Sequence, residues 1–294
     1  MASMAVNRRA TLIAFVALLC SACVDHALVH PRVAPAGVDE WKQSVAHGAL
    51  LIRLEWAKPR GDGPFPTVIV HPEAGHEAHE MRGVLRDLAA HGYLAAAADY
   101  RRLINGRYRN TLFTWRDKDD VRATFDLVRA SPRVDPARVG LLGFSQGGVY
   151  SLSIAAQTGG AAAVVAYYPV TDFEEWLEES GGLLGRRWVF RLIRHHFFRQ
   201  SDAKSDEEFS ELLARASPLR HAEQIRCPVL LIHGDRDKSA GVEQSRRLAA
   251  RLRELGKPVE LLEVPGAGHV FNFRNREKAE LAWQATLRWL DRYL

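Results

Sequence analysis

A serine stands in the segment GFSQG (143–147), where two sequence patterns meet. The residues before it, RVGLLGF (138–144), form a continuous apolar run typical of a buried strand, and residues 149–157 have helical spacing. Glycines two positions before and after Ser145 leave room for a sharp strand-to-helix turn that exposes the hydroxyl group. The segment therefore predicts a nucleophilic serine that could attack a carbonyl carbon.

A serine hydroxyl needs a base, and the base needs a group that orients it. Asp237 follows the apolar run PVLLIHG (228–234), and His269 lies in a glycine-rich loop after the run VELLEV (259–264). If both runs are parallel strands, both loops lie at the same edge of a sheet as Ser145. We predict that His269 is the base and Asp237 the acid that orients it.

Two other aspartates are alternatives for the acid. Asp235 lies in the same loop, two residues before Asp237, and Asp172 follows an earlier apolar run, 162–168. Asp237 is preferred because it lies beyond the turn, on the side of the histidine loop.

The loop after the run TVIVH (67–71) is predicted to help bind an oxyanion. One amide donor would be Gln146, at the start of the helix that follows the serine. Pro72 has no N–H group, so the second donor would be the amide of Glu73 or Ala74.

The same loop, HPEAGHEAHE (71–80), contains three histidines and three glutamates and could be a metal site. The spacing His-Glu-Ala-His (76–79) does not match the H-E-x-x-H pattern that places two histidines on one helical face. We therefore expect no metal and no cofactor, and expect His71 and His76 to line the substrate pocket.

The elements that position these residues alternate along the chain. Six apolar runs are continuous rather than alternating with polar residues, as in strands that are covered on both faces: 67–71, 93–99, 138–144, 162–168, 228–234 and 259–264. Segments with helical spacing follow them: 80–92, 119–130, 149–157, 243–256 and 279–294. This alternation predicts an α/β fold, with a mostly parallel, doubly wound sheet.

Residues 171–224 interrupt this alternation with mainly helical sequence and are predicted to form a cap over the carboxyl edge of the sheet. Within this stretch, RRWVFRLIRHHFFRQ (186–200) combines arginines with apolar residues at helical spacing. We expect its apolar side, including Trp188, to face the substrate pocket.

The N-terminus is predicted to be a signal peptide, residues 1–23. Two arginines precede the apolar run TLIAFVALLCSA (11–22), and the ending LCSAC resembles a bacterial lipobox in which Cys23 would be acylated. Residues 24–40 are predicted to be a linker, and residues 41–294 the globular domain. These features predict a bacterial protein that is exported, either periplasmic or attached to the membrane through a lipid.

The composition argues against nucleic-acid binding. The net charge is +5, but 40 basic residues are set against 35 acidic ones, and no basic stripe follows the predicted elements. The sequence does not indicate an oligomeric state.

Three segments together resemble a known family: DPARVGLLGFSQGG (135–148), SPLRHAEQIRCPVLLIHGDRD (217–237) and EQSRRLAARLRELGKPVELLEVPGAGHVF (243–271). They are similar to the catalytic domain of the prolyl oligopeptidase family (S9) and, almost as closely, to dienelactone hydrolases. The resemblance covers roughly residues 45–170 and 215–294. It implies an α/β-hydrolase fold and a triad of Ser145, Asp237 and His269 that acts on esters or peptide-like amides.

The sequence departs from the peptidase pattern in three respects. The loop after the run 67–71 reads His-Pro-Glu where the family usually has His-Gly-Gly. No acidic pair for binding a peptide amino terminus is recognisable, and the chain has no room for an amino-terminal propeller. We therefore expect a serine hydrolase of small carboxylic esters, with a serine peptidase as the alternative and a non-catalytic binding module as an alternative of another class.

Overall fold

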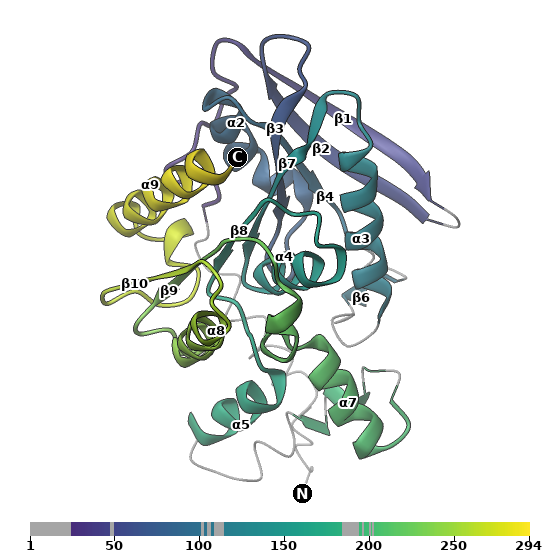
Figure 1. Ribbon diagram of the computed structural model, residues 1–294, viewed down its shortest axis with the longest axis vertical. Coiled ribbons are helices and arrows are strands. Elements are labelled where there is room, and N and C mark those ends of the chain that lie inside the picture. The colour runs from purple at the N-terminus through teal and green to yellow at the C-terminus, as the bar shows by residue number, and fades with distance from the viewer. Residues whose placement is uncertain are drawn as a thin grey trace, which may run out of the picture.

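A single eight-stranded sheet organises the molecule. The computed structural model describes residues 25–47, 50–100, 103–104, 107–108, 115–183, 194–195, 197–199, 201 and 203–294. The strand order is β1-β2-β4-β3-β7-β8-β9-β10, as Figure 1 shows. The strands are β1 (Val38–His47), β2 (Leu50–Pro59), β3 (Phe65–His71), β4 (Leu94–Ala98), β7 (Val134–Phe144), β8 (Ala163–Tyr167), β9 (Val229–Gly234) and β10 (Val259–Val264).

The sheet is parallel from β4 to β10 and antiparallel at its other edge. There β1 and β2 form a hairpin that pairs with β4. A separate two-stranded ribbon pairs β5 (Leu103–Ile104) with β6 (Arg107–Tyr108). The parallel part places the carboxyl ends of β3, β7, β8, β9 and β10 at one edge of the sheet.

Helices cover both faces of the sheet because each has an apolar side. On one face α3 (Trp115–Arg129), α4 (Gln146–Thr158) and α8 (Glu243–Glu254) contribute to one hydrophobic cluster with the strands. On the other face α2 (Arg82–Ala90) and α9 (Arg276–Tyr293) contribute to a second cluster. Figure 1 shows α2 and α9 on one side of the sheet and α3 on the other. The α/β-hydrolase fold is thus confirmed, with a mostly parallel sheet between two helical layers.

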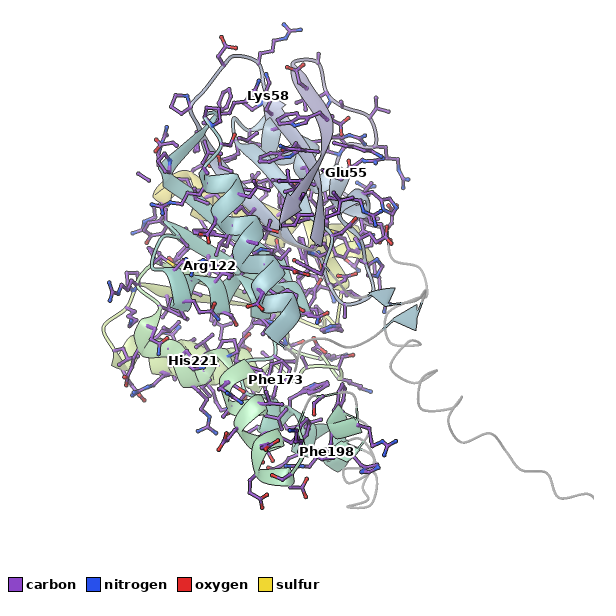
Figure 2. All side chains as sticks on the ribbon, turned by 90° about the vertical axis from the view of Figure 1, so that its right-hand side faces the viewer. Glu55, Lys58, Arg122, Phe173, Phe198 and His221 are labelled. Atoms are coloured by element: carbon purple, nitrogen blue, oxygen red, sulfur yellow. The ribbon has the colours of Figure 1, made fainter. Side chains whose placement is uncertain are left out.

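A helical insertion separates β8 from β9. Its described part comprises α5 (Phe173–Leu183), α7 (Asp206–Ala216) and the 3-10 helix η2 (Pro218–Gln224). Phe173 and Phe198, labelled in Figure 2, lie in the part of the molecule beyond the sheet. This position agrees with the predicted insertion at 171–224, whereas Trp188 lies outside the described residues.

The antiparallel hairpin of β1 and β2 was not among the predicted strands. LLIRLEWAKP in β2 alternates between buried and exposed positions, unlike the continuous runs on which the other strands were recognised. An edge hairpin needs only one buried face, so its period of two is the expected pattern.

The residues predicted to form a linker, 24–40, do not behave as one where the structure describes them: residues 25–37 pack on the domain, and β1 begins at Val38. Residues 25–37 precede β1, and within them His26 is 9% exposed and His30 is 8% exposed. The amide of Asp25 donates to the carbonyl oxygen of Phe273 at 2.9 Å. Cys23 and the predicted signal peptide lie outside the described residues. Within the described part, no helix is both long enough and apolar enough to cross a bilayer.

Candidate active site

Ser145 occupies the turn between β7 and α4 in a strained backbone conformation. Its φ of 50° and ψ of −113° lie in a region that residues with a side chain rarely adopt. The turn is fixed by the amide of Ser145, which donates to the carbonyl oxygen of Tyr167 at 2.9 Å. This geometry places the hydroxyl group at the carboxyl edge of the sheet, as the GFSQG segment predicted.

The two glycines of that segment permit close contacts between backbones. A Cβ atom on Gly143 would lie 2.1 Å from the carbonyl oxygen of Gly147. A Cβ on Gly147 would lie 2.0 Å from the carbonyl oxygen of His71, at the end of β3. No side chain fits at either position without displacing backbone, so α4 can begin directly against the loop that follows β3.

Ser145, His269 and Asp237 form a hydrogen-bonded array. Nε2 of His269 lies 3.0 Å from Oγ of Ser145, and Nδ1 of the same ring lies 2.6 Å from Oδ2 of Asp237. An ionised carboxylate only accepts hydrogen bonds, so Nδ1 carries the proton and Nε2 accepts from the serine hydroxyl. In this tautomer Nε2 can take the serine proton.

Asp237 is held as a carboxylate although it is buried. Its Oδ1 accepts from the amides of Ser239, at 2.8 Å, and Ala240, at 3.0 Å. Burial alone raises the pKa of Asp237, but the charge of His269 and hydrogen bonds from His233 and His269 outweigh it and hold that pKa well below the ordinary value of 3.8. The charged form is therefore available to stabilise a protonated His269.

A pH-dependent contribution to stability follows from this lowered pKa. A carboxyl whose pKa is lower in the folded than in the unfolded chain stabilises the fold above its unfolded pKa of about 4, and this stabilisation is lost as the pH falls. We expect Asp237→Asn to lower the thermal unfolding midpoint at pH 6 and to lower it less at pH 3, where the pH lies below the unfolded pKa and part of the stabilisation has been lost. Differential scanning calorimetry at the two pH values measures this. A difference that grows toward pH 3 would contradict the assignment.

The two alternative acids do not reach the histidine. Oδ1 of Asp235 accepts from the amide of Gly266 at 2.6 Å, which joins the loops after β9 and β10. Asp172 directly precedes α5 of the helical insertion, accepts from the amide of Glu174 at 3.1 Å, and pairs with Arg220 at 3.1 Å. Of the three aspartates, the structure brings Asp237 to His269.

Two further residues shape the surroundings of the array. Tyr168, with a φ of 38°, places its ring 4.6 Å from the ring of His269 and donates to Oδ1 of Asn272 at 2.7 Å. Burial raises the pKa of Tyr168 well above its ordinary value of 10.0, so its hydroxyl stays protonated. His233, fully buried, accepts from Ser245 at 2.7 Å, and its Nε2–H lies between the carbonyl oxygen of Ala240, at 2.8 Å, and Oδ2 of Asp237, at 3.4 Å.

Sequence reasoning missed Tyr168, Asn272 and His233. His233 is the penultimate residue of β9, just before the acid loop, and Tyr168 directly follows β8, so their positions at the ends of strands were the available signals. Asn272 gave no such signal, because it belongs to a three-residue 3-10 helix, η3 (Phe271–Phe273).

Of the predicted oxyanion donors, Gln146 directly follows the serine in the sequence, and Glu73 and Ala74 lie in the loop after β3. Gln146 is the first residue of α4, and its side chain donates to the hydroxyl of Tyr150 at 2.8 Å. Glu73 is 1% exposed, and its Oε1 lies toward His26 and His76. The use of the backbone amides of Gln146, Glu73 and Ala74 as oxyanion donors stays a prediction.

Of the predicted pocket residues, His71 is buried rather than open to a pocket. It is 1% exposed, and its Nδ1 lies 2.8 Å from Oγ of Ser151 on α4. Burial lowers the pKa of His71 to about 3, so the ring is neutral and packs between β3 and α4. His76, partly exposed, contacts Glu80 rather than the serine array.

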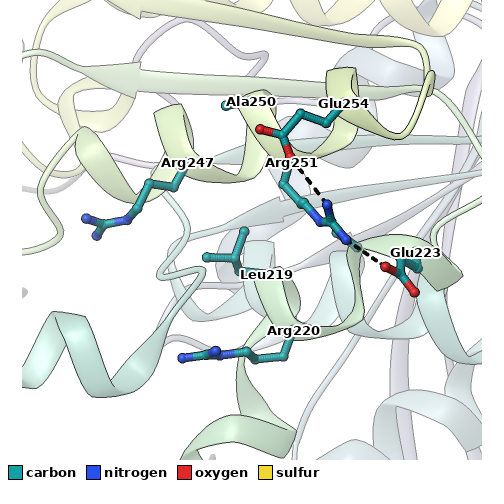
Figure 3. A pocket seen from close by; sticks show the side chains of 8 residues that line it. Leu219, Arg220, Glu223, Arg247, Ala250, Arg251 and Glu254 are labelled. Atoms are coloured by element: carbon teal, nitrogen blue, oxygen red, sulfur yellow. Dashed lines mark hydrogen bonds and ion pairs between the residues drawn. The ribbon is translucent and has the colours of Figure 1, made fainter.

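A cavity of about 540 Å³ lies elsewhere, between η2 and α8 (Figure 3). Three arginines line it, but Arg251 pairs with Glu223 at 2.6 Å and with Glu254 at 3.3 Å, as the dashed lines show. Arg220 and Arg247 also have carboxylate partners. The charges of the three arginines are thus balanced by carboxylates, and the lining of the cavity includes no member of the serine array.

Comparisons with known proteins connect this geometry to a family. The model of the dienelactone hydrolase family matches residues 52–294. A Bacillus subtilis protein named "Uncharacterized peptidase YtmA" is 32% identical over 190 residues, which are 64% of this chain and 69% of the relative. A Methylorubrum extorquens protein named "Putative carboxymethylenebutenolidase" is 26% identical over 254 residues, which are 81% of this chain and 75% of the relative.

Solved structures show the same fold. An acylaminoacyl peptidase in complex with Z-Gly-Gly-Phe-chloromethyl ketone superimposes with a TM-score of 0.71 at 19% identity over 88% of this chain. This chain spans only 42% of that peptidase. The family model covers most of the chain, including all strands of the parallel part of the sheet and the loops that carry Ser145, Asp237 and His269. The chain is therefore a hydrolase and a member of the dienelactone hydrolase family.

Proposed function

We propose that the protein is a serine hydrolase that cleaves carboxylic esters through an acyl-enzyme, with Ser145 as nucleophile, His269 as base and Asp237 as orienting acid. The observation that carries the proposal is the continuous hydrogen-bonded array from Ser145 Oγ to Asp237 Oδ2 through one imidazole, at 3.0 Å and 2.6 Å. This is the geometry of a nucleophile, a base and an orienting group.

In the proposed reaction Ser145 Oγ attacks the ester carbonyl carbon while Nε2 of His269 takes the hydroxyl proton. The oxygen of the tetrahedral intermediate is stabilised by the amide of Gln146 and an amide of the 73–74 loop. His269 then gives its proton to the alcohol oxygen as the C–O bond breaks. A water molecule attacks the acyl-enzyme by the same route and releases the acid.

Two lines of support favour an ester over a peptide bond. The dienelactone hydrolase model matches residues 52–294, and the carboxymethylenebutenolidase relative matches 81% of the chain. The match to the peptidase YtmA covers 64%. A serine peptidase acting through the same residues is the second candidate, and it is favoured by the likeness to acylaminoacyl peptidase.

The test is the intact mass of the folded protein after exposure to a fluorophosphonate. An activated Ser145 forms a phosphonyl ester as the P–F bond breaks and fluoride leaves, so we expect one adduct per chain. Ser145→Ala should remove the adduct and lower esterase activity by about 10⁴-fold or more. Short p-nitrophenyl esters and aminoacyl p-nitroanilides, assayed in parallel, separate the esterase from the peptidase.

Ser153→Ala is the matched control, because Ser153 lies on the same helix α4, two turns beyond the nucleophile. It should keep the adduct. Folded wild-type protein that forms no adduct would overturn the proposal and favour the binding module. An adduct that persists in Ser145→Ala would assign the nucleophile to another residue.

A further inference from the structure

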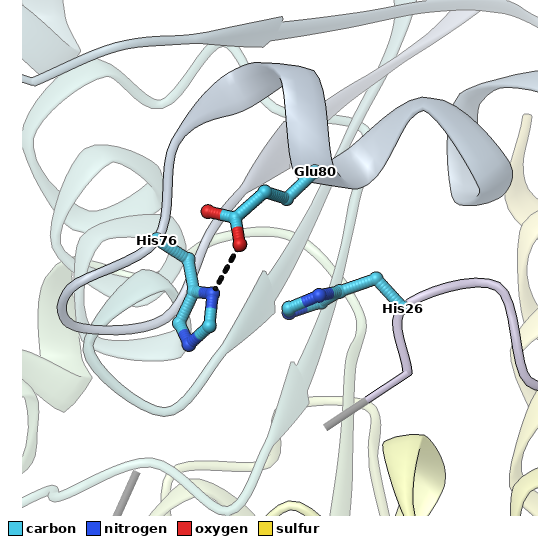
Figure 4. Close-up of side chains that lie close together, drawn as sticks. All are labelled: His26, His76 and Glu80. Atoms are coloured by element: carbon cyan, nitrogen blue, oxygen red, sulfur yellow. Dashed lines mark hydrogen bonds and ion pairs between the residues drawn. The ribbon is translucent and has the colours of Figure 1, made fainter. Parts of the chain in front are cut away.

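A second cluster of chemically competent side chains lies beside the loop that follows β3. His26 comes from the segment before β1, His76 from the loop, and Glu80 from the 3-10 helix η1 (Ala78–Met81). One potential ligand atom from each lies within 4.8 Å of the others, and Figure 4 shows the two imidazole rings converging beside the carboxylate. The serine array uses none of these side chains.

The carboxylate of Glu73 adds a fourth group from the same loop. Its Oε1 lies 3.2 Å from Nε2 of His26 and 3.3 Å from Nε2 of His76. Bonds of 2.0–2.1 Å from zinc to nitrogen or oxygen give ligand–ligand separations of about 3.3 Å in a tetrahedron. Both separations are therefore compatible with the edges of a tetrahedral zinc site.

The hydrogen bonding of His76 also favours a metal site. Nδ1 of His76 lies 2.9 Å from Oε1 of Glu80, while Nε2 faces Glu73. A neutral imidazole has one N–H group and cannot donate to both carboxylates. If Nδ1–H donates to Glu80, the lone pair of Nε2 is directed at the position between His26 and Glu73. A histidine that binds a metal commonly donates its other N–H to a carboxylate in this way.

We propose that His26 Nε2, His76 Nε2 and the Glu73 carboxylate bind one Zn²⁺ ion, with Glu80 orienting His76 and water completing the coordination. The ion has a structural role: it fastens residues 25–37 to the loop whose amides the proposed function assigns to the oxyanion. It touches no reacting atom. The sequence of the loop alone led us to expect no metal, because the additional ligand His26 lies 47 positions before Glu73.

The test is metal binding by the folded full chain after a chelator has removed bound metal. We expect Zn²⁺ to bind with a stoichiometry of one in calorimetry, and Co²⁺ to give the visible absorption of a tetrahedral site. His26→Ala and His76→Ala should each weaken binding by at least about 100-fold. Glu80→Gln should weaken it by about 10- to 100-fold, the usual effect of losing a partner of a ligand.

Two variants serve as matched controls. His79→Ala removes an exposed histidine of the same loop, which pairs with Glu77. His30→Ala removes the other buried histidine of the N-terminal segment, which contacts Asp87 at 2.8 Å. Both should bind Co²⁺ as the wild type does, with far-ultraviolet circular dichroism confirming that each variant is folded.

Absence of stoichiometric Co²⁺ and Zn²⁺ binding to the folded wild type would overturn the proposal. The cluster would then join the N-terminal segment to the loop through hydrogen bonds alone. Binding that survives the double substitution of His26 and His76 by alanine would overturn it as well. The fluorophosphonate adduct at Ser145 is measured on the same chelator-treated protein. Its presence there would show that a failure of the metal site leaves the proposed hydrolase intact.

Discussion

Asp237→Asn should lower kcat/KM for a short p-nitrophenyl ester by about 10⁴-fold, because an amide in place of the carboxylate favours the wrong tautomer of the base. In wild-type protein Nδ1–H of His269 donates a hydrogen bond to Oδ2 of Asp237 at 2.6 Å. An asparagine N–H turned toward the ring would leave Nδ1 as the acceptor and Nε2 protonated, so that Nε2 could not take the serine proton. Steady-state kinetics with matched substrate concentrations measure the effect.

Asp235→Asn is the matched control, since it changes the same charge in the same loop. Asp235 accepts from the amide of Gly266 and does not contact His269. We expect it to change kcat/KM by less than about tenfold through small shifts of the loop. A larger loss in Asp235→Asn than in Asp237→Asn would reassign the acid.

Gly147→Ala should have the second large effect. The new Cβ would lie 2.0 Å from the carbonyl oxygen of His71 and 2.6 Å from that of Pro72, and both atoms belong to backbone. The clash is relieved only if α4 and the loop after β3 move apart. We expect this to lower the free energy of unfolding by about 3 kcal/mol. The expected fall in the unfolding midpoint is about 10 °C. Because the loop carries the proposed oxyanion donors Glu73 and Ala74, esterase activity should fall as well.

The control for this substitution is Gly241→Ala. A Cβ on Gly241 would meet its nearest neighbour, Oε2 of Glu179, at 3.5 Å, which is an ordinary contact. The same added methyl group should therefore leave the midpoint within a few degrees of wild type. If Gly147→Ala unfolded at the same temperature as Gly241→Ala, the close approach of α4 to β3 would not exist in solution.

Local patterns were sufficient to predict most of the parallel sheet. The runs that became β3, β8 and β9 are almost entirely apolar, and β7 is apolar in its second half. The edge strand β10 is apolar except for Glu260 and Glu263. Parallel strands bring their following loops to one edge, which is why the sequence alone predicts that Ser145, Asp237 and His269 lie together. The choice of Asp237 over Asp235 rested only on its position in the loop.

Contacts between distant segments could not be predicted in this way. Asp25 and His26 stand in a stretch with prolines and no periodicity, which is typical of a linker, although the stretch is held by Phe273 and Glu73. The burial of His71 was missed for the same reason: its partner, Ser151, is 80 positions away. The signal peptide, the acylation of Cys23 and the contact of Trp188 with substrate stay predictions from sequence.

The packing of residues 25–37 has a consequence for the order of folding. The ring of His26 lies 4.4 Å from that of Phe273, and the ring of His30 lies 4.5 Å from that of Trp283 on α9, the last helix of the chain. Contacts across such sequence separations form late, because the entropy of closing the loop must be overcome first. Residues 25–37 can therefore dock only once η3 and α9, which lie far along the sequence, are in place.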